Sequence, residues 1–570
     1  MTNPSPTPSL IRPEWPHCGH GATSEDPVGC RGIRVAGHTA CLAHLTDTDR
    51  DTYLAGVTPG ADIDHRGTPF TILLLNALLD ALVDPATGRT RFGDALFDSA
   101  TFSIGAGFGS ATFEGRAGFS SATFQGTAVF GSATFQRGAW FMLATFQGEA
   151  LFRSATFRGD AWFRSAIFQG GADFRSATFQ RDAVFDSATF QGNAWFEEVV
   201  FERAASLGPL VCDGRVVLSR ATFGGPATLS FATRHLECRR THWSSMAEVR
   251  LRYSTVDFAH SVFEYPLTIV AEPDPFVLPG GRLLAETPLA SLPDAAVRLT
   301  SLRGVDAAHL VLANVDLSSC LLTGTVHLDQ VRLEGTCSFD TVPIGTHWRA
   351  GRPVRFTQRR TLAEEHHWRA RQSAAVPGWH AAMPDVGHVG PAQLAPVYRA
   401  LRKAFEDGKN EPGAADFYYG EMEMRRHDRT DTTRTERGLL RSYWMLSGYG
   451  LRASRALSWL AAAMLVTVLL LIGFGLPQDA PKQDATGFVP PGGGRVTFAI
   501  DKADPQNPTG DRFTGKRFER ALNVTLNSVV FRSADQDLTT TGTYIEMASR
   551  VIEPVLLGLA VLAVRNRVKR

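Results

Sequence analysis

Lysine is missing from the first 402 residues of the chain, so arginine supplies their positive charge apart from any charged histidine and the amino terminus. We interpret this absence as codon bias in a GC-rich bacterial genome. Over the whole chain, 58 Lys and Arg residues balance 57 Asp and Glu residues, which leaves a formal net charge of +1. A balanced charge gives no bulk attraction to nucleic acid or to acidic surfaces. We therefore expect no nucleic-acid partner.

Side chains for covalent chemistry are also scarce in the middle of the chain. Residues 92–201 contain neither histidine nor cysteine, so they offer no evident general base or nucleophile. The first fifteen residues lack a basic segment followed by an apolar one, and no secretory signal is predicted from them. The sequence thus predicts a protein that is not an enzyme and whose amino-terminal part lies in the cytoplasm.

Phenylalanine, in contrast, recurs in the middle of the chain with a fixed spacing. In residues 131–147, GSATFQRGAWFMLATFQ, each Phe follows an Ala by two positions. Steps of five and six residues alternate through twenty such positions, and nineteen of the twenty have the preceding Ala, Val199 being the exception. The positions are Phe97, Phe102, Phe108, Phe113, Phe119, Phe124, Phe130, Phe135, Phe141, Phe146, Phe152, Phe157, Phe163, Phe168, Phe174, Phe179, Phe185, Phe190, Phe196 and Phe201.

This eleven-residue period excludes the common regular structures. An α-helix needs apolar residues at steps of three and four, and a strand alternates by two for longer than Gly and Ser allow here. A short fixed period is typical of a solenoid, whose units bury their apolar sides by stacking on one another. We expect phenylalanine to stack on phenylalanine and alanine on alanine inside a narrow, closed core.

The segment resembles the pentapeptide-repeat family, in which each five-residue unit has a central Leu or Phe and an Ala two places earlier. A plainer form follows in LANVDLSSCLLTG, residues 312–324, with Leu312, Leu317 and Leu322 five residues apart. The resemblance implies a mainly β fold, a right-handed parallel four-sided β-solenoid. The extra residue in every second unit is similar to a Phe-rich subclass and implies coils of about 22 residues. The register blurs between His235 and Arg252, and the regular part, 92–270, makes about eight coils, roughly 40 Å long at the spacing of stacked strands.

Near the amino terminus, Cys18, Cys30, Cys41 and His44 are candidate ligands of a structural zinc ion, with His20 as a competing ligand. Thiols in a reducing cytoplasm favour metal over disulfide. Unrelated thiols in a Gly-rich segment remain the alternative, because the cysteines do not form a C-x-x-C pair. No other cofactor is expected.

An apolar run follows in TPFTILLLNALLDALVD. Thr68 suits an N-cap and Pro69 suits a first helical turn. About 14 apolar residues are too few to span a membrane. We expect a helix that covers the open end of the solenoid.

Two apolar stretches near the carboxyl end predict a membrane protein. Residues 456–477 hold roughly 20 residues without a charge, enough to cross a bilayer. The second stretch, 551–564, reaches that length only when extended backwards past Glu546, Arg550 and Glu553, which must then face a bundle interior, water or the interface. Basic residues flank both stretches on the sides away from the connecting loop, so the positive-inside rule places both termini in the cytoplasm and residues 478–544 outside. These residues are Arg437, Arg441, Arg452 and Arg455 before the first stretch and Arg565, Arg567, Lys569 and Arg570 after the second.

Between the solenoid and the membrane, residues 341–390 lose the repeat register. Their sequence EEHHWRARQ places Glu364, Glu365, His366 and His367 in a row, which is not the H-E-x-x-H pattern, and we interpret the segment as a solvated linker. Apolar residues at helical spacing then predict an αα-hairpin over 391–440. The predicted organisation is an amino-terminal Cys/His and capping segment at 1–90, the solenoid at 91–340, the linker at 341–390, the hairpin at 391–440 and a two-span membrane module at 441–570.

The membrane module also resembles the pore domain of potassium channels. In that family a short pore helix precedes T-V-G-Y-G, whose backbone carbonyls line up on the ion. The matching residues here are Thr540, Thr541, Gly542, Thr543 and Tyr544, and the second glycine of the motif is missing. Potassium selectivity is therefore in doubt, and a two-helix anchor remains the alternative.

The favoured hypothesis is a membrane-anchored scaffold that binds a protein partner, as yet unidentified, on the faces of its solenoid. One alternative is a channel-like pore with the solenoid as regulator, and another is the DNA mimicry that a strongly acidic repeat rod can perform on topoisomerases. Residues 91–201 carry ten acidic residues against eight arginines, which argues against the mimic. A homo-oligomer is compatible with each hypothesis.

Overall fold

The structure is a computed structural model of the 570-residue chain. It divides into two compact units, residues 1–417 and 418–570, each of which is described by itself. The description covers residues 12–278, 280–349, 352–373, 375–380, 387, 389–478, 483–488, 491–502, 505–507, 510–530 and 536–568.

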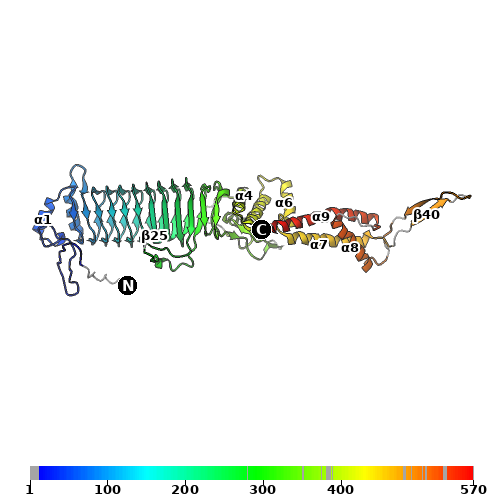
Figure 1. Ribbon diagram of the computed structural model, residues 1–570, viewed down its shortest axis with the longest axis horizontal. Coiled ribbons are helices and arrows are strands. Elements are labelled where there is room, and N and C mark those ends of the chain that lie inside the picture. Colours follow the sequence, from blue (N-terminus) through cyan, green and yellow to red (C-terminus); the bar gives the residue numbers. More distant parts are fainter. Residues whose placement is uncertain are drawn as a thin grey trace. The chain divides into compact units, whose positions relative to one another are not determined.

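The first unit contains a parallel β-solenoid of about 11 turns (Figure 1). A turn consists of four two-residue strands, such as β10 (Thr123–Phe124), β11 (Ala128–Val129), β12 (Thr134–Phe135) and β13 (Ala139–Trp140). The next turn begins at β14 (Thr145–Phe146), whose Thr145 pairs with Thr123 and whose Phe146 pairs with Phe124. The repeat of 22 residues and the four-sided coil are thus as predicted.

Each side of the coil is a ladder of parallel strands. The first face contains β10, β14, β2 (Pro69–Phe70), β6 (Thr101–Phe102), β18 (Ile167–Phe168) and β22 (Thr189–Phe190). The second contains β11, β7 (Ala106–Gly107), β15 (Ala150–Leu151), β19 (Ala172–Asp173), β23 (Ala194–Trp195), β30 (Thr255–Asp257) and β33 (Arg298–Ser301). The third contains β12, β4 (Arg89–Phe92), β8 (Thr112–Phe113), β16 (Thr156–Phe157), β20 (Thr178–Phe179), β24 (Val200–Phe201), β26 (Thr222–Phe223), β28 (His242–Trp243) and β31 (Val262–Phe263). The fourth contains β13, β1 (Ile63–Asp64), β5 (Ala95–Leu96), β9 (Ala117–Gly118), β17 (Ala161–Trp162), β21 (Ala183–Val184), β29 (Ala247–Arg252), β32 (Leu267–Ala271), β34 (Leu310–Ala313) and β35 (Arg332–Glu334).

The repeated phenylalanines form the core of this solenoid, as predicted. Equivalent rings in successive turns stack nearly parallel, as Phe124 does on Phe146 at 4.8 Å and 2°. Rings from neighbouring faces meet edge to face, as Phe130 and Phe141 do at 5.3 Å and 83°. Both geometries are favourable for aromatic pairs. The alanines two places earlier, such as Ala133, are also fully buried.

The repeat persists through residues 235–252, where the sequence reading lost it. Thr222 pairs with His242, and His242 pairs in turn with Val262, so the turn shortens from 22 to 20 residues at this point. Trp243 takes a phenylalanine position and stacks on Phe223 at 4.0 Å. Two long strands, β25 (Ala205–Val217) and β27 (Ala227–Glu237), continue over more than one face of the coil. The shorter period and the replacement of Phe by Trp explain why the repeat could not be recognised in the sequence of this segment.

A long excursion interrupts the later turns between β32 and β33. Thr255 pairs with Arg298 across it, and the helical turn η2 (Thr287–Leu289) lies within it. Phe276, Leu284 and Leu289 are buried with Val211 and Ala232 of the solenoid. The excursion therefore packs onto the solenoid wall.

The solenoid begins before residue 91. Ile63 of β1 pairs with Ala95, and Phe70 of β2 pairs with Phe102 and takes a core position. The predicted apolar helix exists as α2 (Ile72–Ala81), but its N-cap is Thr71, whose hydroxyl accepts from the amide of Leu74 at 3.3 Å. The prediction of Thr68 as cap was wrong because Phe70 belongs to the stack of rings and holds the chain extended there.

Shorter elements complete the first unit. They are η1 (Leu42–His44), α1 (Asp47–Gly56), β3 (Val83–Asp84), η3 (Leu328–Gln330), β36 (Asp340–Thr341), β37 (Thr346–Arg349), β38 (Arg352–Arg355), β39 (Arg360–Thr361), α3 (Ala363–Ala370) and α4 (Pro391–Asp407). The next helix, α5 (Glu411–His427), forms the predicted hairpin with α4, and the boundary between the two units falls inside it.

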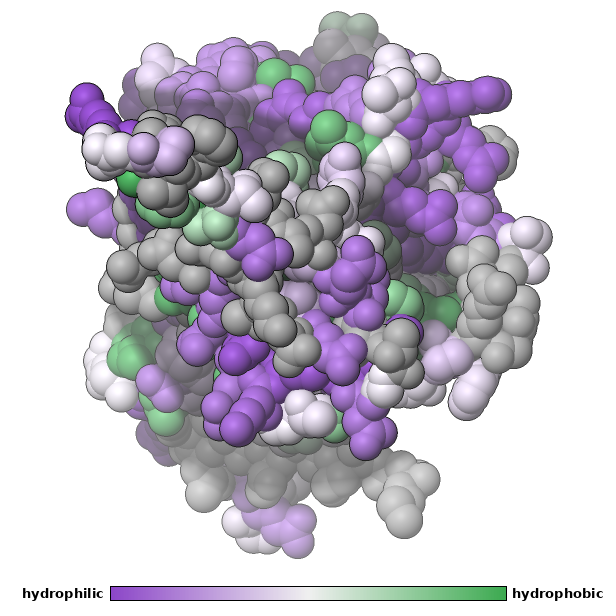
Figure 2. Space-filling view, turned by 90° about the vertical axis from the view of Figure 1, so that its right-hand side faces the viewer, coloured by the Kyte–Doolittle hydropathy of each residue, from purple (hydrophilic) through white to green (hydrophobic). Residues whose placement is uncertain are grey.

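The second unit is mainly helical. It contains α6 (Arg434–Ser447), α7 (Ala453–Leu470), a π-helical turn η4 (Leu471–Gly475), the hairpin strands β40 (Gln483–Phe488) and β41 (Thr497–Lys502), α8 (Gly515–Val529) and α9 (Thr540–Val568). Two stretches, Ala453–Gly475 and Thr540–Arg565, are long and apolar enough to cross a membrane. Apolar side chains such as Leu465, Val551 and Val555 are exposed on these helices. Among the residues that Figure 2 colours, most are hydrophilic and the hydrophobic ones form small groups.

Candidate functional site

The four candidate ligands of the amino-terminal Cys/His cluster lie close together in the structure. One potential ligand atom from each of Cys18, Cys30, Cys41 and His44 lies within 4.8 Å of the other three. The Sγ atoms of Cys30 and Cys41 are 3.7 Å apart, and His44 Nδ1 lies 3.6 Å from Cys18 Sγ and 3.3 Å from Cys41 Sγ. Ligand atoms around a tetrahedral zinc ion lie about 3.3 to 3.8 Å apart, given its usual bond lengths. The four side chains therefore fit such an ion.

Local structure explains why these side chains converge. The backbone amide of Cys18 donates to Gly32, that of Cys30 donates to His20, and that of His44 donates to Cys41 in η1. A Cβ atom on Gly32 would lie 2.8 Å from Cys41 Sγ, so glycine is needed at that position. The ring of His20 stacks on that of His44 at 4.2 Å and is not one of the four.

The thiols of the cluster polarise one another. The hydrogen bond from Cys41 lowers the pKa of the Cys30 thiol to about 5, while the same contact raises the pKa of Cys41. A thiolate is the form that binds metal. The 3.7 Å between the two sulfurs is far beyond the length of a disulfide, about 2 Å.

A groove of about 1130 Å³ runs along one corner of the solenoid, beyond the second face. Its charged side chains come from successive turns, because residues at the same corner repeat at each turn. Seven arginines outnumber four acidic residues in the lining. The arginines are Arg153, Arg175, Arg215, Arg220, Arg239, Arg240 and Arg303, and the acidic residues are Glu197, Glu198, Glu237 and Asp257.

Some of the groove arginines are neutralised within the protein and others are not. Arg220 Nη1 lies 2.9 Å from Glu198, and Arg239 Nε lies 2.7 Å from Asp257. Arg215 and Arg240 are exposed and form no ion pair with any residue that the structure describes. The groove thus presents free positive charge.

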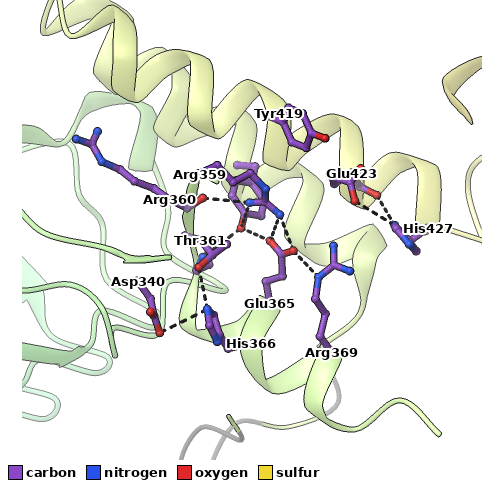
Figure 3. A network of polar contacts seen from close by, with 12 residues as sticks. Asp340, Arg359, Arg360, Thr361, Glu365, His366, Arg369, Tyr419, Glu423 and His427 are labelled. Carbon is purple, nitrogen blue, oxygen red and sulfur yellow. Dashed lines mark hydrogen bonds and ion pairs between the residues drawn. The ribbon is translucent and has the colours of Figure 1, made fainter. Parts of the chain in front are cut away.

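Within residues 341–390, the interpretation of EEHHWRARQ as part of a solvated linker was wrong. Glu364, Glu365, His366 and His367 are all at most 3% exposed, although no two neighbours in sequence share a helix face. Helix α3 achieves this because the solenoid, β36, β39 and α4 enclose it on several sides (Figure 3). Charged side chains can be buried when they are paired, so the polar composition of this segment did not indicate that it is buried.

Helix α3 packs against a late turn of the solenoid. The Glu364 carboxylate accepts from the backbone amides of Leu322 at 2.6 Å and Thr323 at 2.8 Å. Burial raises the pKa of Glu364, and these hydrogen bonds oppose that rise. A charged side chain thereby satisfies backbone donors of a late turn.

Glu365 lies at the centre of the buried network in Figure 3. Arg359 donates to both of its carboxylate oxygens, at 2.6 and 2.7 Å, and Arg369 Nε donates at 2.6 Å. The hydroxyl of Tyr398 in α4 also donates to Glu365. Burial opposes ionisation, but the two guanidinium groups outweigh it and hold the pKa of Glu365 far below its usual range. The network fastens α3 to α4.

The residues compared with a potassium filter are helical. Thr540–Tyr544 is the first part of α9, and the Thr539 hydroxyl accepts from the Gly542 amide at 3.1 Å as an N-cap. A Cβ atom on Gly542 would lie 2.3 Å from the Gly475 carbonyl oxygen, so this glycine serves close helix packing. A helix directs its carbonyls along its axis into its own hydrogen bonds, so Thr540–Tyr544 do not present a row of carbonyls to an ion, and the resemblance to a potassium-channel pore is not confirmed.

Polar side chains of the second unit meet between its helices. Glu553 of α9 is fully buried and accepts from Thr467 of α7 at 2.9 Å, which confirms that it faces the bundle interior. Arg517 of α8 donates to the carbonyls of Ile472, Leu476 and Pro477, each at 2.9 Å, and thereby caps the end of η4. Lys569 and Arg570, used in the orientation argument, lie outside the described residues.

Comparison with known families identifies one part of the chain. A family model described as pentapeptide repeats (9 copies) matches residues 108–156, 130–178 and 163–208. No curated protein and no solved structure was found to match. The matched residues are those of the Phe-core turns.

Proposed function

Because pentapeptide repeats form the solenoid of this chain, we propose that the protein is a non-catalytic scaffold that α7 and α9 anchor in a membrane. Its solenoid docks another protein, and the observation that carries this proposal is the corner groove. Repeats of this kind place Phe and Ala inside and backbone-paired corners outside, an arrangement suited to recognition rather than to bond making.

The charge of the groove defines the partner as an acidic protein segment. Arg215 and Arg240 are exposed and available, and arginine forms strong two-pronged hydrogen bonds with carboxylates. The acidic residues Glu197 and Glu198 within the groove would repel a misaligned segment and so favour one register. A DNA-mimic role finds no support in a groove with this sign of charge.

Anchoring rests on the two apolar helices. Exposed Leu465 and Val551 suit contact with lipid, while Glu553 and Thr467 satisfy each other inside the bundle. Arg437, Arg441, Arg452 and Arg455 precede α7 or open it, which favours a cytoplasmic solenoid by the positive-inside rule.

We also propose that Cys18, Cys30, Cys41 and His44 hold a structural zinc ion. Their spacing fits a tetrahedral site, and the depressed pKa of Cys30 favours the thiolate ligand. With four protein ligands such a site is closed, so its role is to fold the segment that precedes α1 and the first turn of the solenoid.

Binding of a fluorescent decaglutamate peptide to the full-length protein in detergent tests the groove. We expect R215E/R240E to weaken binding at least about tenfold, since each charge-assisted contact is worth more than 1 kcal/mol. The matched control is R137E/R181E, which reverses two exposed arginines outside the groove lining and should bind as the wild type does. If R215E/R240E and R137E/R181E lost the same amount of peptide affinity, the peptide would bind exposed arginines in general, and the proposal of a docking groove would be refuted.

A further inference from the structure

A second cluster of metal-ligating side chains lies at the carboxyl end of the first unit. It joins Asp340 of β36, His366 of α3 and His380 in the segment after α3. One potential ligand atom of each lies within 4.8 Å of the other two. The sequence reading placed all of these residues in or beside a linker and assigned them no role.

The distances in this cluster suit a small divalent ion. Asp340 Oδ2 lies 2.9 Å from His380 Nε2 and 3.5 Å from His366 Nε2, and the two imidazole rings are 4.3 Å apart between centroids. Nitrogen and oxygen ligands on one tetrahedral zinc ion lie about 3.3 Å apart, given bond lengths near 2.0 Å. Two imidazoles and one carboxylate form a common donor set for such ions.

The surroundings of His366 favour a positive charge beside its ring. Its Nε2 atom lies 2.9 Å from the Thr361 hydroxyl and 3.1 Å from the Thr341 carbonyl oxygen, so oxygen atoms gather on this side (Figure 3). The residue is 1% exposed, and its Nδ1 atom has no hydrogen-bond partner within the described residues. An imidazolium at such a depth is costly, whereas a neutral imidazole can serve there as a ligand.

A simple ion pair between Asp340 and His380 is the rival interpretation. The chain contains such a pair at Asp306 and His327, 2.9 Å apart and both about half exposed. That pair has no third ligand, since Asp306 and His327 belong to neither metal-ligating group found in the described residues. The buried imidazole of His366 is what distinguishes the Asp340 cluster.

We propose that Asp340, His366 and His380 bind a divalent transition-metal ion such as Zn²⁺, which fastens α3 and the segment after it to β36. Three protein ligands leave one position for water. The exposed ring of His380, whose side chain is 63% accessible, gives the ion a path from solvent. Because α3 is bonded through Glu364 to a late turn of the solenoid, the ion would stabilise that part of the repeat, independently of whether the groove binds a partner.

Zinc stoichiometry of the full-length protein tests the site. After removal of metal with a chelator and dialysis against micromolar Zn²⁺, we expect H380A and D340N each to hold one equivalent less than the wild type. H327A removes the comparable exposed histidine and should keep the wild-type value. Zinc bound by the Cys/His cluster contributes equally to wild type and variants, so the difference between them reports only the Asp340 site. Co²⁺ absorption also separates the two sites, because only thiolate ligands give intense near-ultraviolet bands.

Thermal unfolding supplies the second measurement. Zn²⁺ should raise the unfolding temperature of the wild type more than that of H380A, since only the former binds the extra ion, and the two should unfold alike in chelator because His380 is exposed. If both H380A and D340N bound as much zinc as the wild type, and Zn²⁺ raised their unfolding temperatures as much, the proposal would be overturned. Asp340 and His380 would then form a simple ion pair.

Discussion

At the scale of single residues, the solenoid depends on alanine methyl groups that lie beside stacked rings. Ala133 and Ala155 occupy equivalent places one turn apart and are fully buried among phenylalanines. A larger side chain has no room there, because successive turns are stacked closely, as the 4.7 Å between the ring centroids of Phe135 and Phe157 shows. The repeat therefore constrains its small residues as strictly as its large ones.

Ala133→Leu tests this constraint. The three added carbon atoms must displace rings in a closed core, and overpacking of this kind costs about 1–3 kcal/mol or more. We expect a clearly lower unfolding midpoint of the β-sheet circular dichroism signal. Gln147→Leu places the same side chain at an exposed corner and should leave the midpoint nearly unchanged; a harmless Ala133→Leu would mean that the core is looser than the ring stacks indicate.

The residue scale also marks where sequence reasoning succeeded. The twenty phenylalanines specify the stack directly, because a side chain of fixed size repeats at a fixed step. Cys18, Cys30, Cys41 and His44 could be singled out by residue type, although their spacing could not show that they meet. His366 and His380 gave no such signal, because their third partner, Asp340, lies more than twenty residues earlier in the chain.

At the scale of elements, the structure differs most from the sequence-based prediction at α3, which was expected to be a solvated segment and is a buried helix. Its four consecutive polar residues are buried because the solenoid end supplies amides to Glu364 and because Arg359, Arg369 and Tyr398 surround Glu365. Periodicity cannot reveal a short helix enclosed on several sides, since no face of it is left apolar. The helical residues 540–544 show the same limit: a motif match gave no information on whether the segment is extended or helical.

The Glu365 network makes the packing of α3 on α4 sensitive to acid. The folded-state pKa of Glu365 is held below the ordinary value of about 4.3. The stability that its ionised form contributes is therefore fully present above that unfolded value and is lost as the pH falls toward the folded pKa. We expect the denaturant midpoint of the wild type to fall as the pH is lowered below about 4.3.

Glu365→Gln provides the comparison for this acid sensitivity. At neutral pH the variant leaves the buried guanidinium group of Arg359 and the largely buried one of Arg369 without a counter-charge, a change that typically costs about 3–5 kcal/mol. Its midpoint should be low at pH 7 and should change less than that of the wild type on acidification. Glu406→Gln removes a surface pair with Arg402 at 3.4 Å and should behave as the wild type. Parallel pH curves for wild type and Glu365→Gln would assign the acid sensitivity to other groups.

At the scale of the whole molecule, the chain combines a rigid repeat with a polar-lined helix bundle. The repeat grows by adding turns, so its coil size and its stacked core follow from the sequence once the period is known. The bundle does not repeat, and its internal contacts, such as Glu553 with Thr467 and Arg517 with the end of η4, depend on which helix faces meet. The sequence indicated that Glu553 cannot face the lipid, but it did not show that Thr467 is its hydrogen-bond partner.

The proposed membrane anchoring predicts which parts of the chain lie on the same side. With α7 and α9 as spans, the β40–β41 hairpin is the only described strand pair between them, and it should face outward while the solenoid and carboxyl terminus face the cytoplasm. An epitope inserted after Gly493 should be reached by antibody on intact spheroplasts, and one at the carboxyl terminus only after permeabilisation.

Arg452 and Arg455 fix this orientation if positive charge governs insertion, so R452E/R455E should expose part of the carboxyl-terminal epitope. Release of the wild type from membranes by alkaline carbonate would instead show that the exposed apolar side chains of these helices contact protein rather than lipid.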